Sequence, residues 1–291
     1  MDIYAVVTEK IINLLEQGVV PWRRPWTSTG LPRNLVSKKP YKGINYFLLS
    51  ASKYVSPFWL TYRQATELGA YVRNGEESTV VVFWKVEDLK QSIEDLGTKE
   101  SDEKNRRRFL LRYYRLFNLQ QCELPQAVLD KLPKIETHQH GPIEAAERII
   151  AGMPNPPEIQ YAGSKAFYSS VIDRVTLPLR ELFISAEEQM ATTYHEVSHA
   201  TGHPKRLNRK SITEAAPFGS PIYATEELVA EMSAAYLCAE SGISPAVIEN
   251  QAAYVAGWLK KLRDDRKLVV HAAAQAQKAA DYILGKCPIP A

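Results

Sequence analysis

Apolar residues recur at helical intervals near the beginning of the chain. The stretch AVVTEKIINLLEQG, residues 5–18, has apolar residues at Val6, Ile11, Leu14 and Leu15 and ends on a glycine, which is typical of an amphipathic helix. Residues 19–43 contain prolines at positions 21, 25, 32 and 40 and predict a long loop, because proline interrupts regular backbone hydrogen bonding. Two short helices are expected after this loop, over residues 44–54 and 60–72.

Strand patterns and a charged segment alternate in the middle of the chain. TVVVFWKV, residues 79–86, and FLLRYYRLFNL, residues 109–119, are rich in β-branched and aromatic residues and predict two strands. Residues 87–108 between them are dense in charge and predict a surface insertion. A connector over residues 132–142 separates the two halves of the chain, and residues 143–152 predict the first helix of the second half.

Length and composition indicate two domains. The 291 residues are 45% hydrophobic, which is enough for two compact cores. We expect an α+β protein, with an N-terminal α+β domain over residues 1–131, a linker over 132–142 and a mostly helical C-terminal domain with a small sheet over 143–286. Three distant cysteines do not predict a disulfide framework. No apolar run approaches the ~20 residues of a membrane span, so a cytoplasmic protein without membrane contact is expected.

The second half contains the motif YHEVSHATGH. Ser185 and Glu188 fit a helix N-terminal capping box, and Gly202 fits a helix end, so the motif is expected on a helix. On a helix His195 and His199 lie on one face and can bind one metal ion, while Glu196 can reach a water beside that ion. Two histidines on a polar helix face are the alternative interpretation.

A third ligand is expected from the downstream stretch ATEELVAEMSAAYLCAE. It carries Glu226, Glu227 and Glu231, and no Lys or Arg occurs between residues 211 and 259 to neutralise them along the helix. The expected site is therefore zinc, or another divalent metal, on His195, His199 and Glu227, with Glu231 orienting an imidazole and Glu196 acting as the general base. A solvated acidic face and His203 as a ligand are the alternatives. VIDRVTLP, residues 171–178, is our candidate for an edge strand that receives an extended peptide.

Basic and aromatic residues are concentrated in the first half. Residues 17–66 contain eight basic and no acidic residues together with nine aromatic residues, whereas residues 151–291 contain 14 basic and 15 acidic groups. Basic side chains attract phosphates and aromatic rings stack on unpaired bases, so this segment predicts single-stranded DNA binding. Filling the core is the alternative role of the aromatic residues. The expected contact residues are Trp22, Arg23, Arg24, Trp26, Arg33, Lys38, Lys39, Tyr41, Lys42, Tyr46, Trp59 and Arg63.

The whole chain resembles the ArdC-type antirestriction proteins of conjugative plasmids, whose N-terminal region is similar to that of TraC-type primases. The resemblance is carried by LLEQGVVPWRRPW, NLVSKKPYKGINYFLLS, FWLTYRQA and RYYRLFNLQQ, and later by DRVTLP, YHEVSHATGHPKRLNR and EELVAEMSAAYLC. It implies an N-terminal domain that binds single-stranded DNA, a zincin-like metallopeptidase domain and protection of incoming DNA from restriction endonucleases. In related zincins the metal-binding glutamate is followed, after two residues, by an alanine and then a polar residue. The stretch ELVAE, which begins at Glu227, matches this pattern, so the resemblance favours Glu227 over Glu226 as the metal ligand.

The sequence is compatible with three functions. The protein protects single-stranded DNA by occupying it, or it is an active metallopeptidase brought by DNA to a restriction endonuclease or another protein substrate. In the third alternative, it holds single strands for a primase. No acidic constellation for nucleotidyl transfer supports the third alternative from within the sequence.

Overall fold

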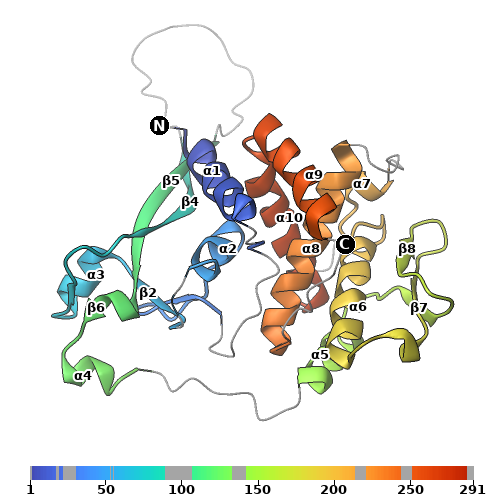
Figure 1. Cartoon of the computed structure of the whole chain (residues 1–291), viewed down its shortest axis with the longest axis horizontal. Helices are drawn as coiled ribbons and strands as arrows, with labels where there is room; N and C mark the ends of the chain where they lie inside the picture. The colour runs from blue at the N-terminus through green and yellow to red at the C-terminus, as the bar shows by residue number, and fades with distance from the viewer. Residues whose placement is uncertain are drawn as a thin grey trace, which may run out of the picture.

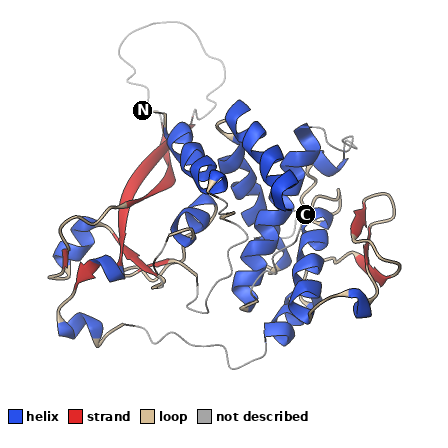
Figure 2. Ribbon diagram, in the orientation of Figure 1, coloured by secondary structure: helices blue, strands red, loops and turns tan. Residues whose placement is uncertain are grey.

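The structure is a computed structural model that describes residues 2–17, 20–21, 31–52, 54, 56–88, 107–132, 142–213, 221–243 and 251–286. In the first half the described elements are helices α1 (Ile3–Glu16), α2 (Ile44–Ser50), α3 (Tyr62–Glu67) and α4 (Gln126–Leu129), the 3-10 turn η1 (Leu119–Gln121), and strands β1 (Arg33–Asn34), β2 (Phe58–Leu60), β3 (Tyr71–Val72), β4 (Thr79–Asp88), β5 (Arg107–Asn118) and β6 (Cys122–Glu123). Figures 1 and 2 show the strands of this half on one side of the molecule and α1 and α2 towards its middle.

A long hairpin dominates the N-terminal sheet, whose strand order is β1-β2-β5-β4. β4 and β5 pair antiparallel from Thr79 opposite Leu116 to Asp88 opposite Arg107. The outer edge of β4 is held by α2, because the Asn45 side chain donates to the Val82 carbonyl and accepts from the Val82 amide, each at 2.7 Å. A side-chain amide thus replaces a neighbouring strand at this point of the edge.

The second half consists of helices around a small sheet. Its elements are α5 (Pro142–Ala151), β7 (Glu158–Tyr161), β8 (Phe167–Ser169), β9 (Arg174–Leu177), the 3-10 turn η2 (Arg180–Leu182), α6 (Ala186–Ala200), α7 (Lys210–Thr213), α8 (Pro221–Ser241), α9 (Gln251–Asp264) and α10 (Leu268–Ile283). The sheet has the order β7-β9-β8. Our expectation of an edge strand over residues 171–178 is wrong, because β9 pairs with β7 on one side and with β8 on the other.

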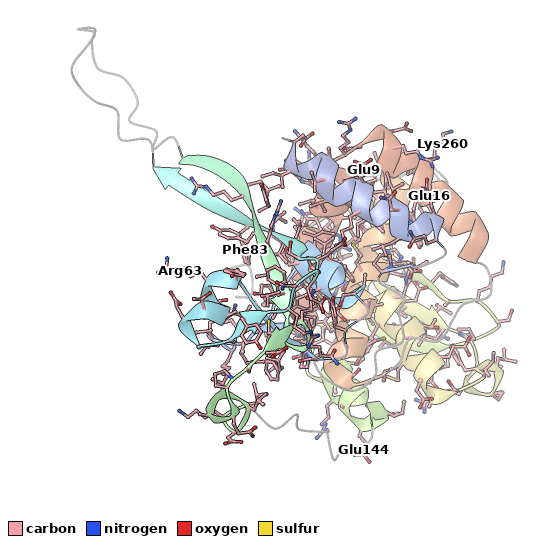
Figure 3. The ribbon with its side chains drawn as sticks, turned by 60° about the vertical axis from the view of Figure 1, so that its left-hand side comes forward. Glu9, Glu16, Arg63, Phe83, Glu144 and Lys260 are labelled. Carbon is pink, nitrogen blue, oxygen red and sulfur yellow. The ribbon has the colours of Figure 1, made fainter. Side chains whose placement is uncertain are left out.

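The largest apolar core joins the two halves of the chain. Helix α1 buries Val7, Ile11 and Leu15 in the same cluster as residues of α8, α9 and α10, and turns Glu9 and Glu16 to solvent (Figure 3). Rings of α2 and α8 also meet, since the Phe47 and Tyr236 centroids lie 4.8 Å apart. The division into residues 1–131 and 143–286 stays a prediction about domains, and α1 and α2 pack against the helices of the second half.

The predicted elements can be compared with the observed ones. The helices expected over 5–18, 44–54 and 143–152 are confirmed as α1, α2 and α5, and the strands over 79–86 and 109–119 are confirmed as β4 and β5. The helix expected over 60–72 is confirmed only as the shorter α3, because Leu60 ends β2 and residues 71–72 form β3. Residues 89–106, most of the predicted insertion, lie outside the described residues. Six strands were not predicted, because they are only two to four residues long and carry little periodic signal; these are β1, β2, β3, β6, β7 and β8. No helix among the described residues has the length and apolar character needed to cross a bilayer.

Replacement of Asn45 by Ala should destabilise the protein by about 2–4 kcal/mol, because it removes the partners of two buried backbone groups of Val82. The free energy of unfolding from urea titration measures this effect. Gln126→Ala is the control, since it removes an exposed hydrogen bond to Asp130 and should change stability by less than about 0.5 kcal/mol. Equal stability of Asn45→Ala and the unmodified protein would refute the structural role of this side chain.

Candidate metal centre

Helix α6 presents the histidine motif from a well-defined start and end. The Ser185 hydroxyl accepts from the Glu188 amide at 3.1 Å, and the Glu188 carboxylate accepts from the Ile184 amide at 2.9 Å, so the predicted helix start is confirmed although the reciprocal bond goes to Ile184. After the helix, Gly202 packs tightly. A Cβ atom there would lie 2.5 Å from Cγ1 of Ile212, so any other residue at this position requires Ile212 to shift.

Helix α8 lies against α6 along a seam of small residues. The hydroxyls of Ser198 and Ser233 are hydrogen bonded at 2.9 Å, and both side chains are fully buried. Small side chains let the two helix axes approach closely. Leu228 and Val229 enter the core from other positions of α8, which fixes the rotation of this helix and directs Glu227 towards α6.

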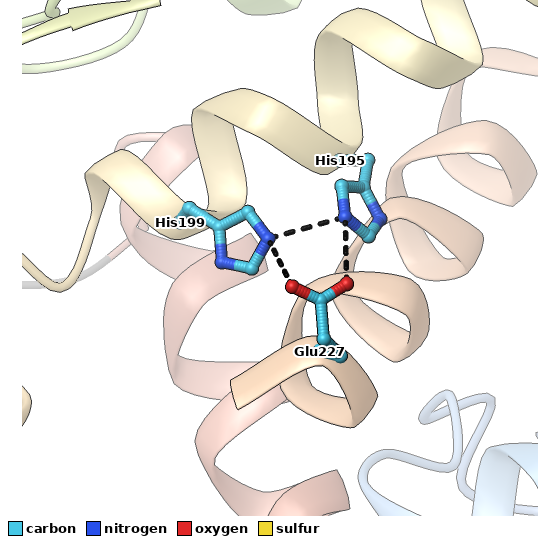
Figure 4. Close-up of side chains that lie close together, drawn as sticks. All are labelled: His195, His199 and Glu227. Carbon is cyan, nitrogen blue, oxygen red and sulfur yellow. Dashed lines mark hydrogen bonds and ion pairs between the residues drawn. The ribbon is translucent and has the colours of Figure 1, made fainter. Parts of the chain in front are cut away.

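His195, His199 and Glu227 converge at this crossing (Figure 4). The Nε2 atoms of the two histidines are 3.1 Å apart. His195 Nε2 lies 3.5 Å from Oε2 of Glu227, and His199 Nε2 lies 3.5 Å from Oε1 of the same carboxylate. Ligand atoms at ~2.0–2.1 Å from a tetrahedral zinc ion are roughly 3.3–3.4 Å from one another. The three separations therefore fit one ion on two imidazoles and one carboxylate, a donor set that suits zinc and other divalent transition metals.

Each histidine also turns its second ring nitrogen towards a carboxylate. His199 Nδ1 lies 3.3 Å from Oε1 of Glu226, and His195 Nδ1 lies 3.8 Å from Oε1 of Glu231. A carboxylate behind a ligand imidazole fixes the orientation of the ring and leaves its other nitrogen free for the metal. Glu231 thus lies where an orienting role was expected, although its distance to His195 is longer than the distance between Glu226 and His199. An orienting role for Glu226 was not predicted.

Arg209 supplies the positive charge that the sequence of α8 lacks. Its Nε donates to Oε2 of Glu226 at 3.1 Å, and the hydroxyl of Ser211 also donates to this carboxylate. Burial raises the pKa of Glu226, but the hydrogen bond from His199 and the charge of Arg209 outweigh it and hold the pKa at about 2. Glu226 therefore remains a carboxylate although it is only 3% exposed.

Acidic neighbours also determine the charge of His195. Burial lowers its pKa, but the hydrogen bond with Glu227 and the charges of Glu231 and Glu196 raise it to about 9. The pKa of Glu227 is lowered, because the interactions with His195 and His199 outweigh the effect of burial. Glu196 itself is 7% exposed and follows His195 in α6. His203 lies outside the metal-binding group and faces Asp173, with Nδ1 4.0 Å from a carboxylate oxygen.

The predicted DNA-binding residues have different surroundings. Trp22, Arg23, Arg24 and Trp26 lie outside the described residues. Tyr46 and Trp59 are each 1% exposed, so the expectation that they stack on bases is wrong, because both rings fill the protein core. The remaining six are Tyr41, which is buried; Arg33, which is half-buried; Lys42 and Arg63, which pair with Asp281 and Glu67; and Lys38 and Lys39, which are exposed.

Three exposed aromatic side chains on the β4–β5 hairpin were not predicted as binding residues. Phe83 is 44%, Tyr113 43% and Tyr114 45% exposed. In the sequence they belong to two predicted strands that lie outside the basic, acid-free segment of residues 17–66. Only the neighbouring arginines, Arg112 and Arg115, gave a signal that these strands extend into solvent.

Loss of a metal ligand should abolish metal binding. Purified protein should contain about one equivalent of divalent metal by inductively coupled plasma mass spectrometry. The metal content of His195→Ala and Glu227→Ala should fall to background. His203→Ala is the matched control, because this histidine is near the motif but outside the group, and it should keep its metal. Full metal content in His195→Ala, or its loss in His203→Ala, would contradict the assignment.

Two family models match the chain. "N-terminal domain of anti-restriction factor ArdC" matches residues 1–117, and "Zincin-like metallopeptidase" matches residues 144–275. Among curated proteins, a DNA primase TraC of Escherichia coli is 37% identical over 97% of this chain, which spans 20% of that primase. A second TraC of the same species is 36% identical, and the chain spans 26% of it. The protein y4eC of Sinorhizobium fredii (strain NBRC 101917 / NGR234) is 36% identical over 97% of this chain and 91% of its own length.

Solved structures of the antirestriction protein ArdC from plasmid R388 share the fold. The metal-free form is 33% identical with a TM-score of 0.77, and the Mn(II)-bound form is 34% identical with a TM-score of 0.74. Each comparison covers 98% of both chains. The α+β architecture and the presence of donors for a divalent metal agree with these relatives. The chain belongs to the family of ArdC-type antirestriction proteins.

Proposed function

We propose that this protein binds single-stranded DNA and, by occupying it, protects incoming plasmid DNA from restriction endonucleases. Antirestriction is the property named for the ArdC relatives, and similarity along nearly the whole chain is the observation that carries the proposal. The basic, acid-free composition of residues 17–66 supports an interaction with phosphates. Lys38 and Lys39 support it further, since both are exposed.

The metal site is proposed as a zinc site of the metallopeptidase type. His195, His199 and Glu227 would hold the ion, which when bound supplies Lewis acidity that polarises a carbonyl and eases the deprotonation of water. Glu226 and Glu231 keep the imidazoles oriented. The Glu196 carboxylate would accept a proton from water, and its low exposure limits competition from bulk solvent. Manganese is a second candidate metal, because one ArdC structure is a Mn(II)-bound form.

Two other functions remain as alternatives. An active peptidase, brought by DNA to a restriction endonuclease or another protein, would use the same Glu196 and the same metal. A protein that holds single strands for priming is favoured by the TraC relatives, in which the matching region is part of a longer primase. The Glu196→Gln variant separates protection by occupancy from the peptidase alternative, and the salt dependence of affinity tests DNA binding directly.

Glu196→Gln tests whether catalysis is required. The variant should keep its metal and its affinity for single strands, because Glu196 is neither a proposed metal ligand nor one of the proposed DNA-binding residues, while any proteolysis should fall by at least ~100-fold. Protection of an incoming plasmid in a restricting host should remain complete. If protection disappears while metal content and DNA affinity stay unchanged, occupancy is insufficient and the peptidase alternative is favoured.

Affinity for single-stranded DNA should fall with salt, with a log-log slope of about −0.7 for each phosphate contacted. Lys38→Ala and Lys39→Ala should each flatten the slope by roughly 0.7 if each lysine contacts one phosphate. Lys165→Ala is the control, because this lysine is exposed on the second half of the chain. Fluorescence anisotropy over a salt series gives the slopes. Unchanged slopes in both variants would remove these lysines from the interface, and equal affinity for duplex would contradict single-strand binding.

A further inference from the structure

A cleft of about 610 Å³ lies beside the outer edge of β4. Its walls come from the segment of residues 34–45, from Gln64 in α3, from Phe83 in β4 and from Gln277 and its neighbours in α10. The volume lies within the ~300–1,000 Å³ that is usual for ligand clefts. Because α10 belongs to the second half of the chain, both halves contribute walls. We name this site the Phe83 cleft.

The charge of the cleft favours an anionic ligand. Its lining includes Lys39 and Lys42 and contains neither Asp nor Glu. Lys42 is paired with Asp281 at 3.0 Å, so its charge is partly neutralised. Lys39 is exposed, and no ion pair of Lys39 occurs among the residues that the structure describes. The Lys39 ammonium group can therefore attract phosphate at the cleft, whereas Lys38, next to it, is exposed outside the lining, with Nζ 5.8 Å from the centroid of the Phe58 ring.

Phe83 provides a ring on which a flat ligand can stack. Its side chain is 44% exposed although it lies on a strand, and its centroid is 5.5 Å from that of Tyr114 and 6.3 Å from that of Tyr41. Phe83 pairs with Arg112, whose exposed side chain therefore shares its face of the hairpin. Figure 3 shows Phe83 on the hairpin and Arg63 of α3 on the same side of the molecule. Solvent-exposed rings beside basic groups are typical of sites for unpaired bases.

The polar walls are fixed by hydrogen bonds within the protein. The Asn34 amide donates to the Tyr41 hydroxyl at 3.2 Å and to the Gln64 carbonyl oxygen at 3.1 Å, and its own carbonyl oxygen accepts from two backbone amides. The side-chain oxygen Oε1 of Gln277 accepts a hydrogen bond from the backbone amide of Gly43 at 3.1 Å. These amides hold the segment that carries Lys38 and Lys39 in place. Because they are already engaged, they favour stacking over recognition of a particular base.

We infer that the Phe83 cleft takes up an unpaired base of a single-stranded nucleic acid, stacked on Phe83, with an adjacent phosphate near Lys39. The inference rests on the proposed binding of single strands and specifies where and how it occurs. A paired base cannot enter without leaving its partner, so the cleft discriminates against duplex. The base is held without strong sequence preference.

The test measures the anisotropy of a labelled oligo(dT) of about 16 nucleotides. Phe83→Ala should weaken binding about 5- to 100-fold, as expected for the loss of one base stack, and Phe83→Trp should restore it. Tyr113→Ala is the matched control. Tyr113 is equally exposed at 43%, but it pairs with Val82 and so lies on the opposite face of the hairpin. Its loss should change affinity by less than about twofold, and circular dichroism of all variants checks that they fold.

Photo-crosslinking locates the base directly. An oligonucleotide that contains 5-iododeoxyuridine should crosslink to the peptide carrying Phe83, and crosslinking should be lost in Phe83→Ala. If the unmodified protein does not bind single strands, the proposed function fails. If it binds them but Phe83→Ala behaves like Tyr113→Ala, only the assignment of the cleft is overturned. Competition by free dTMP as strong as that by the oligonucleotide would identify a free nucleotide as the occupant and would also overturn the assignment.

Discussion

The crossing of α6 and α8 is the contact on which the metal site depends. Ser198 and Ser233 allow the two helices to touch, and this contact brings Glu227 to within 3.5 Å of both histidines. Such a group of buried carboxylates is costly unless positive charge compensates it. Arg209 compensates one side through Glu226, and the imidazoles face the other carboxylates. A divalent cation on these residues would complete this balance of charge and would explain why the acidic face points inward.

The local parts of the site could be predicted from the sequence. Four-residue spacing defines the histidine pair, and the lack of cations along α8 indicated that its carboxylates need compensation from elsewhere. The source of that compensation could not be predicted, since Arg209 lies 17 residues before Glu226 in the chain and the two side chains meet only in the folded protein. The place of β9 in the middle of its sheet was unpredictable for a related reason. It depends on parallel pairing with β7, which has no local signature.

Aromatic residues illustrate the same limit in the first half. Tyr46, Trp59 and Phe83 all occur near basic residues, and composition alone cannot distinguish a ring in the core from a ring in solvent. The structure buries Tyr46 and Trp59 in the core and leaves Phe83 44% exposed in the cleft beside β4. The basic character of the segment was visible in the sequence, and the face that can receive a base was not.

The shared core places the proposed DNA site and the metal site in one packed body. Helix α10 lines the Phe83 cleft and also packs in the cluster that contains α8. Coordination of one ion by residues from α6 and α8 can be measured by X-ray absorption at the zinc edge of the purified protein. The spectrum should show only nitrogen and oxygen neighbours at ~2.0–2.1 Å with the scattering pattern of two imidazoles, whereas a sulfur neighbour at ~2.3 Å or the absence of imidazole would refute this metal site.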